Sequence, residues 1–201
     1  VADLPWKLVA TGEEVRQTML IHRLGNSLPS ARRDLLIVSP YFVPRTSGAE
    51  QLLARVEEGV RVRVLTNSLA ATDVAIVHAG YKQYRKSLLA GGVELYELMP
   101  SGQPTVESYE RGVFGSKSAS LHAKTYVVDE RFVFVGSLNL DPRSIELNTE
   151  LGLVVDSPEL ARQIIERAES AMTPDSSWRL TLSDTGWPRW HGERDGEAVV
   201  L

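Results

Sequence analysis

One stretch of the chain, LHAKTYVVD at residues 121–129, decides how the sequence is interpreted. Its apolar half is typical of a buried strand, and residues two apart on a strand point to the same side. His122 and Lys124 are therefore expected to project together. If the strand continues, Tyr126 lies on that side and Val127 on the other.

A second stretch, GSLN at residues 136–139, follows the next predicted strand and supplies Ser137 and Asn139. The four polar side chains suit an anionic phosphoryl group. Lys124 brings a fixed positive charge, and Asn139 and Ser137 bring neutral donors for nonbridging oxygens. A histidine titrates near neutral pH, so His122 can attack phosphorus or carry a proton.

The same residues are a poor fit for a metal site. A cationic lysine beside the histidine opposes a divalent ion, and no second histidine lies nearby in the sequence. The chain has no cysteine, which excludes disulfides and thiolate ligands. We therefore expect neither a metal nor another cofactor.

Composition sets further limits. The formal net charge is −4, from 22 Lys and Arg against 26 Asp and Glu, which does not favour a strongly basic nucleic-acid binder. No apolar run approaches the roughly 20 residues of a membrane-spanning helix. The chain begins at Val1 and shows no signal peptide, so we interpret it as a piece of a longer protein.

Segments of strand and helix character alternate along the chain. Strands are predicted at 35–39, 60–64, 93–98, 123–128, 132–135 and 150–155. Helices are predicted over 11–24, 47–59, 72–90 and 158–168, with capping boxes at Thr11 and Ser47 and Pro158 in a first turn. Residues 100–120 are predicted to form an exposed loop. The alternation indicates a single α/β domain over residues 1–201, with helices packed on a sheet.

The tail, residues 173–201, holds three of the four tryptophans. Trp178, Leu180 and Leu182 alternate with polar residues, and a turn is predicted at 184–186. We therefore expect a peripheral C-terminal β-hairpin. Its tryptophans are expected to cover the sheet edge or the core, and the alternative is an interface with the rest of the protein or with a membrane.

The two polar stretches resemble the signature of the phospholipase D superfamily, His-x-Lys-x4-Asp followed by Gly-Ser-x-Asn, and every specified position is filled. The chain is similar to bacterial cardiolipin synthase-like members, and we interpret it as the C-terminal half of such a two-motif protein. Further similar segments are SPYFVP at 39–44, TNS at 66–68, HAGY at 78–81, GVELY at 92–96, NLDPRS at 139–144 and ELNTE at 146–150. The resemblance implies a mixed β-sheet sandwiched between helices.

The resemblance also implies roles for individual residues. His122 is expected to be one of two paired histidines, acting as acid and base while the other attacks phosphorus. Lys124 and Asn139 are expected to bind the phosphate, with Ser137 assisting. Glu150 stands where the family has a carboxylate that orients the histidine, and such a carboxylate fixes the tautomer and stabilises the imidazolium.

Asp129 and Gly136 complete the motif, and we expect Asp129 to be structural. Along an extended strand it lies roughly 7 × 3.3 Å from His122, too far for a shared reaction centre. We expect its carboxylate to bind backbone or a basic side chain.

Three other residues have two interpretations each. His78 is expected either to line the substrate entrance or to be a solvated helical histidine. Tyr41 and Phe42 are expected to pack in the core, and contact with lipid glycerol or acyl groups is the alternative.

The reaction that the resemblance implies is transfer of a phosphatidyl group from one phospholipid to phosphatidylglycerol, giving cardiolipin through a phosphohistidine. The family's site needs a second motif facing the first, expected upstream in the natural chain; pairing of two copies is the alternative. We expect contact with the bacterial cell membrane, peripheral or through segments absent from this chain. The rival functions are a phosphodiesterase or nuclease of the same superfamily and a non-catalytic lipid- or partner-binding module; nucleic acid is not an expected partner.

Overall fold

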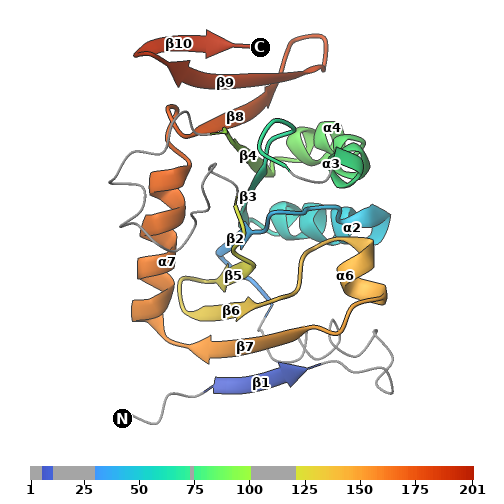
Figure 1. Cartoon of the computed structure of the whole chain (residues 1–201), viewed down its shortest axis with the longest axis vertical. Helices are drawn as coiled ribbons and strands as arrows, with labels where there is room; N and C mark the ends of the chain where they lie inside the picture. The colour runs from blue at the N-terminus through green and yellow to red at the C-terminus, as the bar shows by residue number, and fades with distance from the viewer. Residues whose placement is uncertain (1–5, 11–29, 73–74, 101–120) are drawn as a thin grey trace.

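The computed structural model describes residues 6–10, 30–72, 75–100 and 121–201 (Figure 1). These residues form a ten-stranded sheet with the order β1-β7-β6-β5-β2-β3-β4-β8-β9-β10. The strands are β1 (Trp6–Ala10), β2 (Asp34–Val38), β3 (Arg61–Asn67), β4 (Glu94–Leu98), β5 (Thr125–Val128), β6 (Phe132–Gly136), β7 (Leu151–Asp156), β8 (Ser177–Leu182), β9 (Pro188–Arg194) and β10 (Glu197–Val200). The helices are α2 (Arg45–Glu57), α3 (Ala75–Lys82), α4 (Arg85–Ala90), α6 (Pro142–Glu146) and α7 (Pro158–Ala171).

The sheet is mixed. β2, β3 and β4 pair in parallel, whereas β5 pairs antiparallel with β2. The antiparallel pattern continues through β6, β7 and β1 on one side and through β8, β9 and β10 on the other. This arrangement confirms the predicted fold class.

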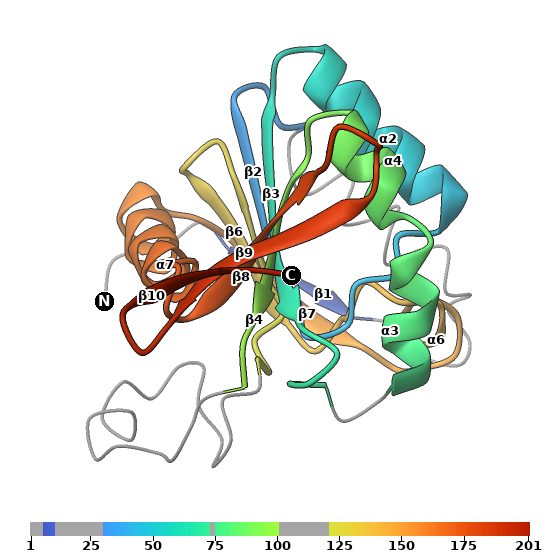
Figure 2. The same cartoon turned by 90° about the horizontal axis from the view of Figure 1, so that it is seen from above.

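Helices cover both faces of the sheet. Figures 1 and 2 show α7 on one face and α2, α3, α4 and α6 on the other. Successive strand residues therefore enter different cores: Leu36 and Val127 pack on the α7 side, while Ile37 and Tyr126 pack on the opposite side. Tyr126 and Val127 thus lie on opposite faces, as the period of a strand predicts.

Side-chain caps begin two of the helices. Ser157 precedes α7, and its Oγ accepts a hydrogen bond from the Leu160 N–H at 3.2 Å, with Pro158 in the first turn as predicted. Asp141 precedes α6, and its carboxylate accepts hydrogen bonds from the backbone N–H groups of Arg143 and Ser144. The second cap holds the turn that follows the polar stretch 136–139.

Two predicted helices differ from the structure. α2 begins at Arg45 after Pro44, with no side-chain cap, so the predicted capping box at Ser47 is wrong. The predicted helix over 72–90 is two helices, because the Gly80 carbonyl accepts from the Gln83 side chain and the Tyr81 carbonyl accepts from the Tyr84 N–H three residues on. The predicted helix at 11–24 and nearly all of the predicted loop at 100–120 lie outside the described residues.

The tail continues the sheet. β8 pairs antiparallel with β4, and β8 and β9 form the predicted hairpin. Gly186 has φ +75° in the connecting turn, a conformation that glycine adopts without strain. β10 adds a further strand that no sequence pattern indicated.

Candidate active site

The polar residues of the two motif stretches lie at one edge of the sheet. β2 and β3 run toward this edge, and so does β6, because β5 is antiparallel to both β2 and β6. β5 and β7 start from the same edge. Lys124 therefore precedes β5, Ser137 follows β6 and Glu150 precedes β7, all at the same end of neighbouring strands.

His122 reaches the surface at this edge, since its side chain is exposed. The preceding residue is held by an amide clamp from β3: Asn67 Nδ2 donates to the Leu121 carbonyl at 3.2 Å, and the Leu121 N–H donates to Asn67 Oδ1 at 2.8 Å. Asn67 and Leu121 are both buried. A paired amide contact of this kind fixes the backbone that presents the exposed imidazole.

Lys124 is buried beside His122. Its side chain is only 8% exposed, and Nζ donates a hydrogen bond to the His122 carbonyl at 2.8 Å. A buried ammonium needs such acceptors because it has left water. The contact ties the lysine to the backbone of the histidine and places a positive charge at the edge.

Five polar side chains form a chain of hydrogen bonds that joins the start of β7 to the end of β6. The Ser137 hydroxyl donates to the Glu150 carboxylate, and Asn148 Nδ2 donates to the other carboxylate oxygen at 3.3 Å. The Ser144 hydroxyl accepts from Asn148 at 3.5 Å and from Asn139 at 3.3 Å. Ser144, Glu150 and Asn139 are all buried. Three residues of the predicted site therefore share one network.

One atom of that network has no partner. Asn139 Oδ1 is buried without a hydrogen bond within the described part of the chain. The Ser144 hydroxyl can donate as well as accept, so the amide can turn by 180° and accept from Ser144 instead. In either orientation one polar atom of Asn139 remains for a ligand.

A buried tyrosine supports the turn that carries Ser137 and Asn139. The Tyr126 hydroxyl donates to the Leu138 carbonyl at 2.7 Å, between the motif residues Ser137 and Asn139. Burial raises the pKa of Tyr126, and the carboxylates of Glu150 and Asp141 raise it further. The phenol therefore remains a neutral donor that holds the 136–139 turn in place.

Gly136 is required by close packing of β6 on β7. It pairs with Gly152, and a Cβ on Gly136 would overlap the Leu151 carbonyl and the Phe134 ring. A Cβ on Gly152 would also overlap that ring. The glycine of the motif therefore sets the distance between the strands that carry Ser137 and Glu150.

Asp129 lies at the far end of β5, at the opposite edge of the sheet. Its carboxylate accepts hydrogen bonds from the backbone N–H groups of Arg32, Arg33 and Asp34 at 2.8–3.1 Å. Burial acts to raise the pKa of Asp129, but these donors outweigh it and the pKa is lowered. This backbone contact is the kind expected for Asp129.

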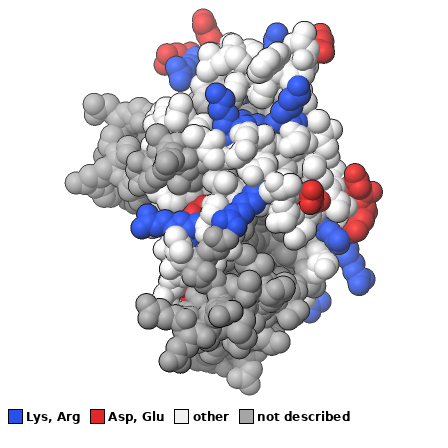
Figure 3. Space-filling model, turned by 90° about the vertical axis from the view of Figure 1, so that its right-hand side faces the viewer, with Lys and Arg blue, Asp and Glu red and all other residues white. Residues whose placement is uncertain are grey.

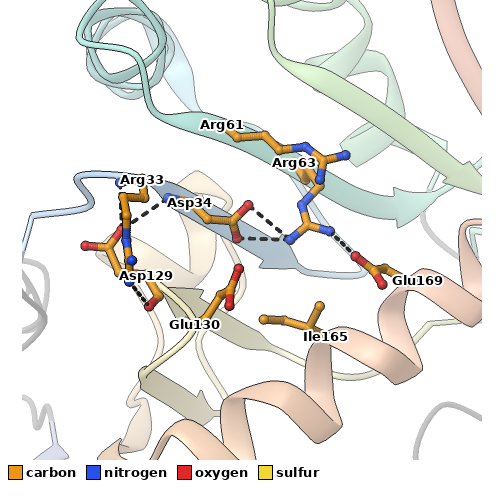
Figure 4. A pocket seen from close by; sticks show the side chains of 8 residues that line it. All are labelled: Arg33, Asp34, Arg61, Arg63, Asp129, Glu130, Ile165 and Glu169. Atoms are coloured by element: carbon orange, nitrogen blue, oxygen red, sulfur yellow. Dashed lines mark hydrogen bonds and ion pairs between the residues drawn. The ribbon is translucent and has the colours of Figure 1, made fainter.

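An open pocket surrounds Asp129 at that far edge (Figure 4). Arg63 points into it and is bound by Asp34 at 3.0 Å and by Glu169 at 2.7 Å. Its remaining lining residues are Arg33, Arg61, Glu130 and Ile165. Arg63 is paired with Asp34 and Glu169, so this pocket is part of the polar rim of the core under α7.

The remaining predicted residues are His78, on α3, and Tyr41 and Phe42, in the segment between β2 and α2. His78 is buried on α3 and contacts Arg85, so it is not a solvated helical histidine. Phe42 is 1% exposed and belongs to the core, whereas Tyr41 is half-buried. The Val43 N–H donates to the Leu140 carbonyl, which joins the segment after β2 to the motif turn.

Sequence reasoning missed Asn67, Ser144 and Arg85. Asn67 and Ser144 fall in segments whose similarity to the family was noted, but no local pattern indicates their partners. Asn67 contacts a residue 54 positions away. Only tertiary structure brings such pairs together.

Neither a metal cluster nor a membrane span appears in the described ranges. No group of three or more His, Cys, Asp and Glu side chains among these residues is placed to hold a metal ion. No described helix is both long and apolar enough to cross a bilayer. Figure 3 shows Lys and Arg across the middle of the face seen there, with Asp and Glu mostly nearer its rim.

The chain is similar in sequence to known proteins. Residues 24–172 match the family described as "Cardiolipin synthase, PLD-like domain". Cardiolipin synthase C of Escherichia coli (strain K12) is 44% identical over 190 residues, which are 94% of this chain and 40% of that protein. Cardiolipin synthase A of Buchnera aphidicola (strain APS) is 27% identical over 158 residues, or 79% of this chain and 28% of that protein. The chain thus spans less than half the length of these curated relatives.

Solved structures share the fold. The phospholipase D family member Nuc from Salmonella typhimurium superposes with a TM-score of 0.60 at 16% identity, covering 84% of this chain and 93% of that one. Phosphatidylserine synthase of Haemophilus influenzae gives a TM-score of 0.61 at 18% identity, covering 88% of this chain and 40% of that one. At these identities the likeness concerns the fold alone. From the family match and the close sequence relative, the chain belongs to the cardiolipin synthase family of proteins with a phospholipase D-like domain.

Proposed function

We propose that this chain is one catalytic half of a phosphatidyltransferase that makes cardiolipin from phospholipids through a phosphohistidine. The observation that carries the proposal is that His122, Lys124, Ser137 and Asn139 lie at one edge of the sheet, in a chain 44% identical to cardiolipin synthase C. The exposed imidazole of His122, beside a buried ammonium, supports chemistry on an anionic group that arrives from outside the protein.

The proposed reaction has two steps. A histidine of the second half attacks phosphorus, the P–O bond to the leaving alcohol breaks, and His122 gives that alcohol a proton. His122 then takes the proton of the acceptor hydroxyl, whose oxygen bonds to phosphorus as the P–N bond breaks. His122 ends in the protonation state in which it began, so one residue serves as acid and then as base.

Lys124 and Asn139 are proposed to bind the nonbridging oxygens. Negative charge grows on these oxygens as phosphorus is attacked, and fixed donors in a site shielded from water stabilise it. With the amide of Asn139 turned by 180°, Oδ1 accepts from Ser144 and Nδ2 is left to donate to a phosphoryl oxygen, which supports this role. Ser137 and Glu150 are proposed to hold the loop, and Glu150 to orient His122. No step requires a metal ion, since Lys124 and the amide already offset the charge.

The second histidine is proposed to come from another half with the same motif, upstream in the natural chain. The chain supplies one His-x-Lys-x4-Asp sequence, and the reaction as written needs two histidines. Phospholipid in a membrane is the proposed substrate, reached by peripheral contact or through segments outside this chain.

The test is His122→Ala in the full-length natural protein, with lipid products separated by thin-layer chromatography. We expect the variant to lose cardiolipin formation and EDTA to leave the wild type active. His191→Ala is the matched control, since His191 is bound to Thr181 in the tail hairpin. Undiminished product from His122→Ala would refute the assignment, and nicking of plasmid DNA without lipid turnover would favour a nuclease.

A further inference from the structure

A buried polar network outside the motif is left unexplained by the proposed reaction. Arg85 is 4% exposed, and its Nε donates to Glu97 Oε1 at 2.7 Å. The other Glu97 oxygen accepts from Trp190 Nε1 at 3.0 Å. The guanidinium also lies against two rings, 4.7 Å from the Tyr81 centroid and 5.2 Å from that of Trp190. α4, β4 and β9 together hold this arginine rigidly.

The arginine determines the tautomer of His78. Arg85 Nη2 lies 2.6 Å from His78 Nε2. An arginine side chain has only donors and stays protonated, so Nε2 must accept, and the proton of the neutral ring is on Nδ1. Burial, with the positive charges of Arg85 and Lys82, lowers the pKa of His78 to about 4. His78 is therefore a permanent neutral donor at pH 7.

His78 contributes to the wall of a small cavity. His78 lines it together with Pro40, Phe42, Thr66, Asn67, Thr72 and Tyr81. It has room for about one water molecule, and its described lining includes no Asp, Glu, Lys or Arg. Nδ1 of His78 forms no hydrogen bond within the described part of the chain. A cavity of this size and neutrality suits a hydroxyl group rather than a phosphate.

The cavity adjoins the segment that presents His122. Asn67 lines the cavity and also clamps the backbone of Leu121, the residue before His122. Thr66, on the same strand, donates to the Pro40 carbonyl at 3.3 Å and closes the cavity toward β2. Asn67 therefore connects the cavity to the backbone that presents the imidazole which the proposed function assigns as the base.

We infer that this cavity is the subsite for the acceptor alcohol, in which the Nδ1–H of His78 binds the oxygen of a glycerol-type hydroxyl. The inference rests on the proposed function. Because His78 donates to the oxygen, the hydroxyl hydrogen stays free to point toward a base. Such a hydroxyl competes with water for the phosphohistidine, so the subsite raises the ratio of transfer to hydrolysis.

The first experiment compares two variants in the full-length protein, with phosphatidylglycerol vesicles as donor and acceptor. Asn places a donor near Nδ1, whereas Gln places its amide near Nε2, where it can accept from Arg85. We expect His78→Gln to lower the ratio of cardiolipin to phosphatidic acid about fivefold, the effect of one neutral hydrogen bond. His78→Asn should keep the ratio within about twofold, and His191→Asn should match the wild type. An unchanged ratio in His78→Gln would overturn the inference.

A second measurement tests the subsite without measuring lipid turnover. The 15N NMR shifts of the His78 ring in the wild-type protein should show the proton on Nδ1 between pH 5.5 and 8, and free glycerol should shift that resonance. Inorganic phosphate is the comparison probe and should leave it in place. A proton on Nε2, or no change of the Nδ1 resonance with glycerol, would contradict the proposed subsite. If the wild type turns over no lipid but glycerol still shifts Nδ1, the proposed function has failed and the subsite has not.

Discussion

Lys124 and Asp129 belong to the same motif but lie at opposite ends of β5. Lys124 donates to the backbone of His122 at the edge of the sheet that holds the candidate site. Asp129 caps three backbone N–H groups before β2 at the far edge. Lys124 is therefore tied to the histidine that we propose to react, and Asp129 anchors the neighbouring strand at its other end.

Lys124→Met in the full-length protein should lower the rate of phosphatidyl transfer by about 100-fold or more, because a fixed charge on the phosphoryl oxygens is lost. Methionine has similar length, so the thermal midpoint should change little. Radiolabelled lipid turnover and a circular dichroism melt measure the two effects. Lys86→Met, at an exposed position of α4, is the control. A loss of activity that merely follows a loss of folding would contradict the role.

Asp129→Asn should lower stability at neutral pH, and the difference should disappear in acid. The folded pKa of Asp129 lies below its ordinary value of 3.8, so its ionised form stabilises the fold above that value. The contribution fades as the pH falls through the lower folded pKa, where the acid resembles the amide. Asparagine tolerates the positive φ of 53° at this position.

Thermal midpoints of Asp129→Asn and the wild type between pH 2 and 7 measure this dependence. Asp184→Asn, in the exposed β8–β9 turn, is the control. A constant difference at every pH would show that the carboxylate charge is not the cause.

At the scale of elements, the spacing of β6 and β7 sets the geometry of the site. Gly136 and Gly152 face each other, and the Phe134 ring fills the space that their missing side chains leave. Ser137 follows β6 directly, and its hydroxyl accepts the Leu151 N–H at 3.0 Å. Any change in this spacing moves Ser137 relative to Glu150.

Gly152→Ala should destabilise the protein by about 1–3 kcal/mol, the usual effect of inserting a methyl group into a packed core. The new Cβ would overlap the Phe134 ring, which is fully buried and cannot move aside. Urea unfolding measures the change, and the transfer rate should fall with it. Gly48→Ala, within α2, should keep its stability, because the higher helix propensity of alanine offsets the 3.3 Å contact of its Cβ with Pro44 Cβ. Wild-type stability in Gly152→Ala would show that the strands can separate without loss.

At the scale of the whole molecule, the described part of the chain presents the exposed His122 at the edge of the sheet that holds the candidate site. The helices cover the two faces of the sheet (Figures 1 and 2), and we expect the proposed second half to meet the first at this edge. The proposed reaction needs two histidines on opposite sides of one phosphorus. We therefore expect a complete site only where a second chain segment joins this one.

The 201-residue chain alone should show little or no transfer activity compared with the full-length protein. Product formation per mole of protein, from the same vesicles, measures the difference. Turnover at the full-length rate would contradict the need for a second half. A symmetric dimer with two His122 side chains at one phosphate would replace that half with a second copy.

The sequence by itself determined the strands from β2 to β9, the opposite faces of Tyr126 and Val127, and the motif, but not β1 or β10. These features repeat over two to four residues, or lie within one family signature, and local periodicity captures them. It misplaced the start of α2 and the break between α3 and α4, because side-chain and short-range hydrogen bonds decide where a helix begins and ends.

Only the tertiary structure decided which side chains support the motif. Asn67 holds the residue before His122 across 54 positions, and Trp190 reaches Glu97 across 93. Nothing local in the sequence marks such pairs, because their energy comes from burying polar groups that must then find partners wherever the fold places them. The tertiary structure also decided that His78 is buried, because its exposure depends on how α3 packs on the sheet.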